Sequence, residues 1–232
     1  MKILVVIPAY NEEENIKRVV DHLVTHHPEL DYIIINDGSS DRTSEICHAE
    51  GYSIVDLPVN LGLAGAFQTG MRYAAYHGYD AAVQFDGDGQ HRPEYIADMA
   101  AKIGEGYDIV IASRFVTEKK PHSLRMLGSN LIEGAIRLIS GVRIKDPTSG
   151  MRMYNQRLIR VCADLEDFGP EPDTVSFLIK NGAKVAEIQA VMDERIAGES
   201  YLNLGASVKY MLRMMISILI IQNFRKTKKI FG

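Results

Sequence analysis

The first 113 residues alternate between two patterns, and this alternation limits the possible folds more than any other feature of the chain. Residues 2–8 (KILVVIP) form a continuous apolar run rich in β-branched residues, which is typical of a strand buried on both faces. Similar runs predict further strands over residues 32–36, 53–57, 81–85 and 107–113. Because helical segments lie between them, we expect an α/β fold with a mostly parallel sheet flanked by helices.

Helical spacing of apolar residues marks the intervening segments. Ile16, Val19 and Leu23 repeat in this way, and we expect Asn11 to cap the helix that carries them. Further helices are predicted over residues 63–77, 93–103, 124–140, 155–163, 173–181 and 204–224, with a last strand over 184–191. Residues 146–154 are polar and predict an irregular loop. We expect one domain over residues 1–203, followed by a C-terminal amphipathic helix and basic tail over 204–232.

Composition narrows the class of protein. The net charge of −4 argues against a protein that wraps a polyanion, so we expect no nucleic-acid partner. Cys47 and Cys162 are too few for a disulfide framework or a Cys-x-x-Cys metal site, which favours the reducing cytoplasm. The acidic start of the chain does not resemble a signal peptide. The sequence has no run of about 18 apolar residues, so we expect no transmembrane helix.

Polar residues follow the predicted strands at the edge where open parallel sheets bind ligands. The most informative of them are Asp86-Gly87-Asp88, since paired carboxylates at a strand end suit a hard divalent ion that also takes phosphate oxygens. A plain Asp-Gly turn is the alternative. A calcium EF-hand is excluded, because His91 and Ala97 stand where that loop needs Gly and Glu.

The glycines at 62, 65 and 70 open a helix but do not match the Gly-x-Gly-x-x-Gly fingerprint, and no Walker A loop is present. NAD-binding and P-loop functions are therefore disfavoured, although a phosphate at this helix N-terminus stays open. In the second half, Arg125 and Ser129 lie one helical turn apart. Together with Arg114, Arg152 and Arg195 they form a candidate anion-binding set, each alternatively a solvated surface residue.

Six motifs in order give the chain a family resemblance: PAYNEE, NDGSSDRT, NLGLAGAFQTG, FDGDGQHRP, ASRF and DPTSGMRMY. Together they resemble the GT-A glycosyltransferases of family 2, and within these the dolichol-phosphate mannosyltransferase-like branch, the polyprenyl-phosphate glycosyltransferases. The resemblance covers about residues 1–200. It implies a GT-A (Rossmann-like) sheet and a metal-dependent hexosyltransferase.

The resemblance also implies a role for each matching residue. Asp37 would hold the nucleotide base, Asp86 would lie near the donor sugar and ribose, and Asp88 would ligate Mg²⁺ or Mn²⁺ with Gln90 beside it. The nucleotide would be lined by Pro8, Ala9, Tyr10, Glu12 and Gly62. On the acceptor side, the matching residues are Arg114, the Arg125 and Ser129 pair that would bind the acceptor phosphate, and Arg195. Ser200-Tyr201 departs from the usual Ser-Lys pattern after Arg195.

The function that this resemblance implies is inverting transfer of glucose or N-acetylglucosamine from a UDP-sugar to polyprenyl (undecaprenyl) phosphate, for cell-surface glycan synthesis. The acceptor phosphate is already anionic, so arginines that position it would suffice. One alternative is a family 2 transferase that acts on a sugar hydroxyl and needs a carboxylate base, for which Glu171 and Asp173 are candidates. Another is a non-catalytic protein that binds nucleotide sugars.

The last 25 residues are apolar and then abruptly basic. Residues 214–224 are uncharged but reach only about 17 Å as a helix, too short for a bilayer core of about 30 Å. The basic residues that follow, Arg225, Lys226, Lys228 and Lys229, could meet anionic headgroups. We expect peripheral binding at the inner face of the cell membrane or docking of a small membrane-protein partner; packing on the core or in a homo-oligomer is the alternative.

Overall fold

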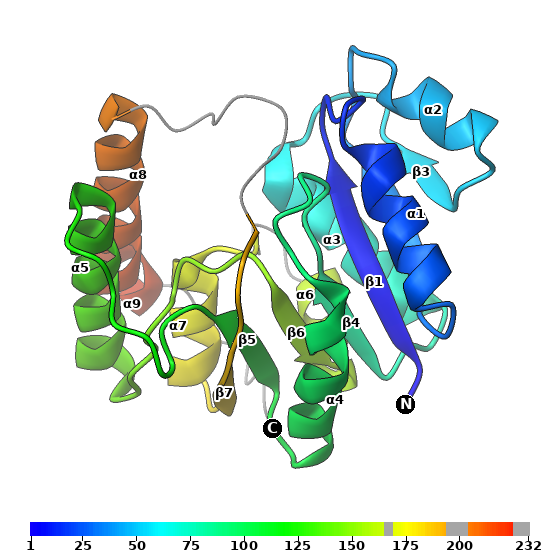
Figure 1. The fold of residues 1–232 in the computed structure, drawn as a ribbon. Helices are drawn as coiled ribbons and strands as arrows, with labels where there is room; N and C mark the ends of the chain where they lie inside the picture. The colour runs from blue at the N-terminus through cyan, green and yellow to red at the C-terminus, as the bar shows by residue number, and fades with distance from the viewer. Residues whose placement is uncertain (165–168, 194–203, 225–232) are drawn as a thin grey trace.

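The computed structural model describes residues 1–164, 169–193 and 204–224, and within them a seven-stranded sheet runs through the molecule (Figure 1). Its spatial order is β3-β2-β1-β4-β6-β5-β7. The strands are β1 (Ile3–Ala9), β2 (Asp31–Asn36), β3 (Ile54–Asp56), β4 (Ala81–Gln84), β5 (Ile109–Ser113), β6 (Arg152–Asn155) and β7 (Val185–Gln189). Neighbouring strands are parallel except where β6 pairs with β4 and β5. The predicted mostly parallel α/β sheet is confirmed.

Helices cover both faces of this sheet, as the sequence predicted. They are α1 (Ile16–His26), α2 (Thr43–Ala49), α3 (Gly62–Tyr76), η1 (Pro93–Tyr95), α4 (Ile96–Gly104), α5 (Leu124–Ser140), α6 (Gln156–Asp164), α7 (Pro172–Lys180), α8 (Leu204–Ile216), η2 (Ser217–Ile221) and α9 (Gln222–Phe224). Successive side chains of β1 point to opposite faces of the sheet, and each face has its own hydrophobic core. Val5 and Ile7 pack with α1, α2 and α4, whereas Leu4 and Val6 pack with α3, α5, α6, α7 and α8.

Two local predictions were wrong. Residues 152–154, predicted to be irregular, belong to β6, which is inserted antiparallel between β4 and β5. Asn11 does not cap α1, which begins at Ile16. Instead Asn11 has φ of 55°, a left-handed conformation that asparagine tolerates, and its Oδ1 accepts a hydrogen bond from the backbone N–H of Ser40 (2.8 Å). Asn11 thus joins the loops that follow β1 and β2.

The C-terminal segment, predicted as one long helix, is α8, a π-helical turn at η2, and α9. It runs beside α5 (Figure 1) and contributes Met214 and Ile218 to the same core as α5 and α7. Side-chain hydrogen bonds attach it to α7: Tyr210 donates to Glu171, Ser217 donates to the carboxylate of Asp173, and the amide of Gln222 donates to the backbone carbonyl of Asp173. None of the helices in the described ranges is long and apolar enough to cross a membrane.

A glycine in α3 sets how closely this helix packs on β1. A Cβ on Gly70 would lie 2.2 Å from Cγ1 of Val6, a β-branched side chain in the middle of the sheet. We therefore predict that Gly70→Ala lowers the free energy of unfolding by about 1–3 kcal/mol, because neither β1 nor α3 can shift to make room without disturbing its other contacts. Urea denaturation followed by circular dichroism measures this change.

Gly134→Ala in α5 is the matched control, since nothing lies within 4 Å of the Cβ that it adds. It should raise the free energy of unfolding by about 0.5–1 kcal/mol through helix propensity alone. Equal effects of the two substitutions would contradict the proposed role of Gly70 in packing.

Candidate active site

The loops after β1 and β2 and the start of α3 meet at the carboxyl edge of the sheet. Asp37 is buried at their junction: its backbone N–H donates to the carbonyl of Ala9 (2.8 Å), and its Oδ1 accepts from the N–H of Leu61 (2.7 Å). The N–H of Glu12 donates to Oγ1 of Thr43 (2.8 Å). The structure therefore brings together the residues predicted to bind the nucleotide: Pro8, Ala9, Tyr10, Glu12, Asp37 and Gly62.

The Asp86-Gly87-Asp88 turn follows β4 and lies against the same edge. A Cβ on Gly87 would be 3.3 Å from the carbonyl oxygen of Pro8, so the turn touches the end of β1. Asp88 is 5% exposed and its Oδ1 accepts from the N–H of Gln90 (3.0 Å). The side-chain amide of Gln90 donates to the backbone carbonyl of Asp193 (3.3 Å), which leaves its oxygen as the atom suited to a cation.

His91, which sequence reasoning did not assign, holds Asp86 in place. Its Nδ1 accepts from the N–H of Asp86 (2.9 Å), and its Nε2 lies 3.6 Å from Oδ2 of that carboxylate. Oδ1 of Asp86 accepts from the side-chain amide of Gln84 (2.9 Å). The signal for this role was its position at the end of the DGDGQH motif.

The residues present fit a divalent cation that is shared with a ligand. Among residues 1–164, 169–193 and 204–224, no three His, Cys, Asp or Glu side chains are grouped so as to hold a metal by themselves. Mg²⁺ does not need such a cage, since proteins commonly bind it through one or two carboxylates plus substrate phosphates. Asp88, with Asp86 two residues away, supplies the oxygen chemistry for that kind of site.

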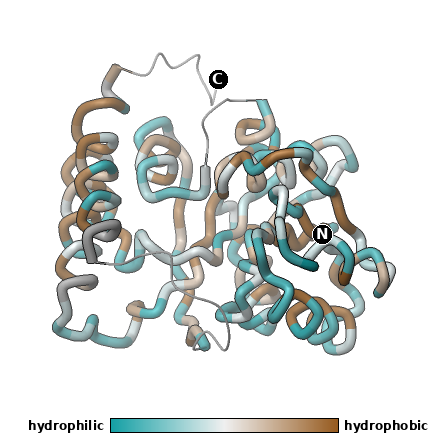
Figure 2. Tube along the Cα trace, turned by 90° about the horizontal axis from the view of Figure 1, so that it is seen from above, coloured by the Kyte–Doolittle hydropathy of each residue, from teal (hydrophilic) through white to brown (hydrophobic). Residues whose placement is uncertain are grey.

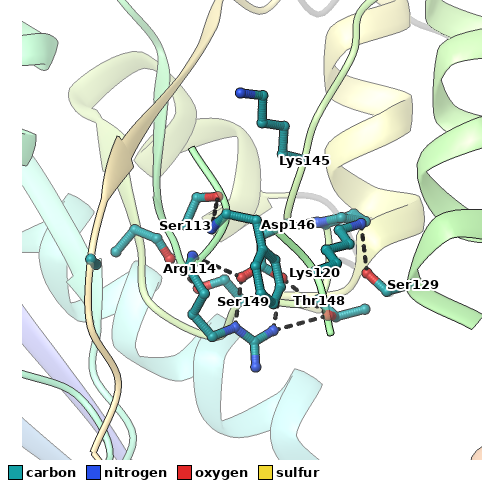
Figure 3. Close-up of polar contacts among 12 residues, drawn as sticks. Ser113, Arg114, Lys120, Ser129, Lys145, Asp146, Thr148 and Ser149 are labelled. Carbon is teal, nitrogen blue, oxygen red and sulfur yellow. Dashed lines mark hydrogen bonds and ion pairs between the residues drawn. The ribbon is translucent and has the colours of Figure 1, made fainter. Parts of the chain in front are cut away.

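A loop between α5 and β6 connects the Asp86-Gly87-Asp88 turn to Arg114, one of the residues predicted on the acceptor side. Asp146 on this loop is fully buried and accepts from Nε (2.7 Å), Nη2 (2.8 Å) and the backbone N–H (3.1 Å) of Arg114, as Figure 3 shows. At the other end of the loop, a Cβ on Gly150 would be 2.6 Å from Oδ2 of Asp86. One short segment therefore touches Asp86 and binds the arginine at the end of β5.

Charge pairing dominates the chemistry of this loop. Burial by itself would raise the pKa of Asp146, but the hydrogen bonds and positive charge of Arg114 outweigh it and hold that pKa below its ordinary value. Arg152 is buried too, and its guanidinium donates to the carbonyls of Ser149 (2.9 Å), Pro170 (2.7 Å) and Pro147 (2.7 Å). The prediction that Arg152 belongs to an anion-binding set is wrong, because its side chain is buried in the interior and each of its three nitrogens donates to a backbone carbonyl.

The predicted acceptor residues are only partly placed. Ser129 is buried on α5, and its Oγ accepts from Nζ of Lys120 (3.3 Å), a contact drawn in Figure 3. The backbone of Arg125 lies one turn earlier on the same helix. Arg195, Ser200 and Tyr201 lie outside the described residues. Sequence reasoning missed Lys120, although its position in the basic segment after the Ser-Arg strand end was a usable signal.

The two carboxylates considered as general bases have structural partners. Glu171 accepts a hydrogen bond from the hydroxyl of Tyr210, and Asp173 accepts one from Ser217. Burial and the negative charge of Glu171 raise the pKa of Tyr210, so the phenol keeps its proton and remains the donor. Both carboxylates therefore attach the C-terminal helices to α7.

Comparisons with known proteins find relatives in both sequence and fold. Residues 4–162 match the family described as glycosyl transferase family 2. Polyprenol monophosphomannose synthase of Mycolicibacterium smegmatis is 28% identical over 221 residues, covering 89% of this chain and 82% of that protein. Undecaprenyl-phosphate mannosyltransferase of Micrococcus luteus is 29% identical, with 88% and 89% covered. UDP-N-acetylglucosamine–dolichyl-phosphate N-acetylglucosaminyltransferase of Methanococcus voltae is 30% identical, with 70% and 72% covered.

Solved structures of similar fold include glucosyl-3-phosphoglycerate synthase from Mycobacterium tuberculosis. Its complex with Mn²⁺, uridine diphosphate and glucosyl-3-phosphoglycerate has a TM-score of 0.66 and 22% identity, and the match covers 94% of this chain and 80% of that one. A complex of the same enzyme with Mg²⁺ and uridine diphosphate gives the same TM-score, with 94% and 79% covered. At this identity the likeness is one of fold.

The buried Asp146 leads to a prediction about stability and pH. Asp146→Asn should lower the free energy of unfolding at pH 7 by about 3–5 kcal/mol, because it leaves Arg114 without its charged partner. Because the folded-state pKa of Asp146 is depressed, its contribution is present above the ordinary value of 3.8 and is lost as pH falls through the folded-state pKa. The difference between the two proteins should therefore shrink below pH 3.8.

Urea titrations of both proteins across this pH range provide the measurement. Asp98→Asn on the exposed face of α4 is the control and should change the free energy of unfolding by less than about 0.5 kcal/mol. A difference between wild type and Asp146→Asn that does not vary with pH would refute the ionic role of Asp146.

Proposed function

Since the chain belongs to glycosyl transferase family 2 and is a glycosyltransferase, we propose that it moves a hexose from a UDP-sugar to polyprenyl phosphate, with inversion at the anomeric carbon. The observation that carries this proposal is the distribution of charge along the carboxyl edge of the sheet. Carboxylates follow β4, whereas Arg114, Lys120 and the hydroxyl of Ser129 lie on the other side of the 146–150 loop.

The donor half would bind the nucleotide at the ends of β1 and β2. Asp37 is held by backbone contacts on both sides and would receive the base, while Tyr10 and Glu12 would line the nucleotide. Asp86, kept in position by His91 and Gln84, would lie against the ribose and the sugar. These side chains orient the anomeric carbon toward the acceptor side, which is their contribution to the rate.

Asp88, with Gln90 beside it, would hold Mg²⁺ or Mn²⁺ against the pyrophosphate of the donor. When bound, such an ion supplies positive charge for the nucleoside diphosphate that leaves. The burial of Asp88 favours this role, because electrostatic interactions are stronger where water is excluded.

The acceptor half needs to position an anion rather than remove a proton. A phosphate monoester is already ionised near neutral pH, so its oxygen can attack without a strong general base. Arg125 and Ser129 would bind this phosphate, with Arg195 as a further proposed contact. The two carboxylates that could have served a hydroxyl acceptor, Glu171 and Asp173, are hydrogen-bonded to the C-terminal helices. A phosphate acceptor therefore agrees better with the structure than a sugar hydroxyl.

We also propose that α5 and α8 lie on the inner face of the cell membrane. Val208, Leu212, Ile216 and Ile220 recur every four residues and are 45–60% exposed, while Met214 and Ile218 are buried. The adjacent α5 exposes three more apolar side chains: Leu127, Leu131 and Leu138. Figure 2 shows apolar residues recurring among polar ones along these helices. Lys209 and Arg213 are exposed beside this apolar stripe, as suits anionic headgroups.

Incubation with UDP-sugars, Mn²⁺ and undecaprenyl phosphate should give a glycolipid that mass spectrometry detects. UDP-glucose and UDP-N-acetylglucosamine come first, and GDP-mannose is included because two relatives are named for mannose. Asp88→Asn should lower the transfer rate by at least about 100-fold through loss of the metal. Arg125→Ala should abolish transfer to the lipid phosphate. A wild-type protein that forms no glycolipid from either UDP-sugar would contradict the proposal.

Leu212→Glu with Ile216→Glu should abolish co-sedimentation with vesicles that contain anionic phospholipid, since two charges would enter the apolar stripe. Both residues are exposed, so the protein should remain folded. Val24→Glu on α1 changes an equally exposed apolar residue and should leave co-sedimentation unchanged. Unchanged partitioning of the double variant, or binding only when a small membrane protein is supplied, would contradict direct contact with lipid.

A further inference from the structure

A basic pocket of about 420 Å³ lies between the segment after β5, the middle of α5 and the turn after α5. Its charged and amide-bearing lining includes Lys119, Lys120, Asn130, Glu133, Arg143 and Lys145. Four cationic side chains face this pocket against the two carboxylates of Glu118 and Glu133, in a chain whose net charge is −4. Such a local excess of positive charge favours an anionic ligand.

Lys120 connects this pocket to Ser129, the serine of the proposed acceptor site. Its ammonium donates to Oγ of Ser129 (3.3 Å) and to Oε2 of Glu133 (2.9 Å). An ammonium has three N–H donors, so these two contacts leave capacity for a further acceptor. The side chains of Lys120 and Glu133 are only 12% and 13% exposed, so their electrostatic interactions with nearby charges are weakened less by water.

Glu133 is shared between two cations, so it does not neutralise the pocket. Its Oε1 accepts from Nε of Arg143 (2.8 Å) while Oε2 receives Lys120. Burial would raise the pKa of Glu133, but the hydrogen bonds and charges of Lys120 and Arg143 outweigh it and lower that pKa, which keeps the carboxylate ionised at neutral pH. Two cations held by one carboxylate leave a net positive charge beside Ser129.

We propose that Lys120 binds the phosphate of the acceptor together with Ser129, and that Glu133 is an internal anion that holds Lys120 in position and competes with that phosphate. This inference rests on the proposed function. It adds a positively charged binding residue from the segment after β5, and it assigns Glu133 an effect opposite to that of Lys120. The ligand chemistry is a phosphate monoester.

The two residues can be told apart because their removal should act in opposite directions on the acceptor KM. Lys120→Met should raise the KM for a short-chain polyprenyl phosphate by about 10-fold or more, through loss of a charge-assisted hydrogen bond. Glu133→Gln should lower that KM by about threefold, since Lys120 loses its competing carboxylate. The KM for the UDP-sugar should stay unchanged in both variants, which separates the acceptor's phosphate from the phosphates of the donor.

Three controls accompany this measurement. Lys120→Arg keeps the charge and should keep the acceptor KM within about threefold of the wild type. Lys102→Met removes a partly exposed lysine on α4, paired with Glu105, and should change neither KM. Inorganic phosphate should compete with the acceptor in the wild type and compete at least about 10-fold more weakly in Lys120→Met.

An acceptor KM that is unchanged in Lys120→Met, or raised in both Lys120→Met and Glu133→Gln with a parallel loss of thermal stability, would overturn the inference and indicate a structural ion pair. Glu133→Gln and Lys120→Arg keep the test decisive if Lys120→Met does not fold. A wild-type protein that transfers nothing to polyprenyl phosphate fails at an earlier step and refutes the proposed function itself. The two failures are therefore distinct.

Discussion

The ion pair between Asp146 and Arg114 is the interaction on which the rest of the site depends. Asp146 is fully buried, and the guanidinium and backbone of Arg114 supply the donors that make this possible. The backbone N–H of Asp146 also donates to Glu187 on β7 (2.9 Å). A buried carboxylate that loses such partners is strongly destabilising, so the loop that begins at Asp146 has one stable position at the end of β5 and β7.

That position determines how the two halves of the site face each other. The same loop ends at Gly150, which lies against Asp86, and then enters β6 between β4 and β5. Arg152 stabilises the loop from inside by donating to its carbonyl groups, which could not otherwise be satisfied away from water. The loop therefore lies between Asp86 on one side and Arg114 on the other, and its own Asp146 pairs the charge of Arg114.

The sequence predicted the long parallel strands well, because strands buried on both faces must be apolar throughout. It missed β6 for the same reason: four residues that include a buried arginine do not resemble a core strand, and only the surrounding carbonyls make that arginine stable there. The donor-side residues could be predicted to lie near one another because they follow parallel strands, whose carboxyl ends meet at one edge of the sheet. Lys120 and Glu133 were missed because their contact joins a loop to a helix 13 residues away.

The attachment of α8 to α7 has a geometric consequence. Tyr210 and Ser217 are two helical turns apart and both bind carboxylates at the start of α7, so the C-terminal segment cannot roll about its long axis. The direction in which the exposed apolar stripe faces is therefore fixed relative to the carboxyl edge of the sheet. Pro170, just before α7, accepts a hydrogen bond from the buried Arg152, so α7 is itself anchored to the interior of the domain. The tilt of the domain on a bilayer would therefore be determined by contacts inside the protein and not by the lipid.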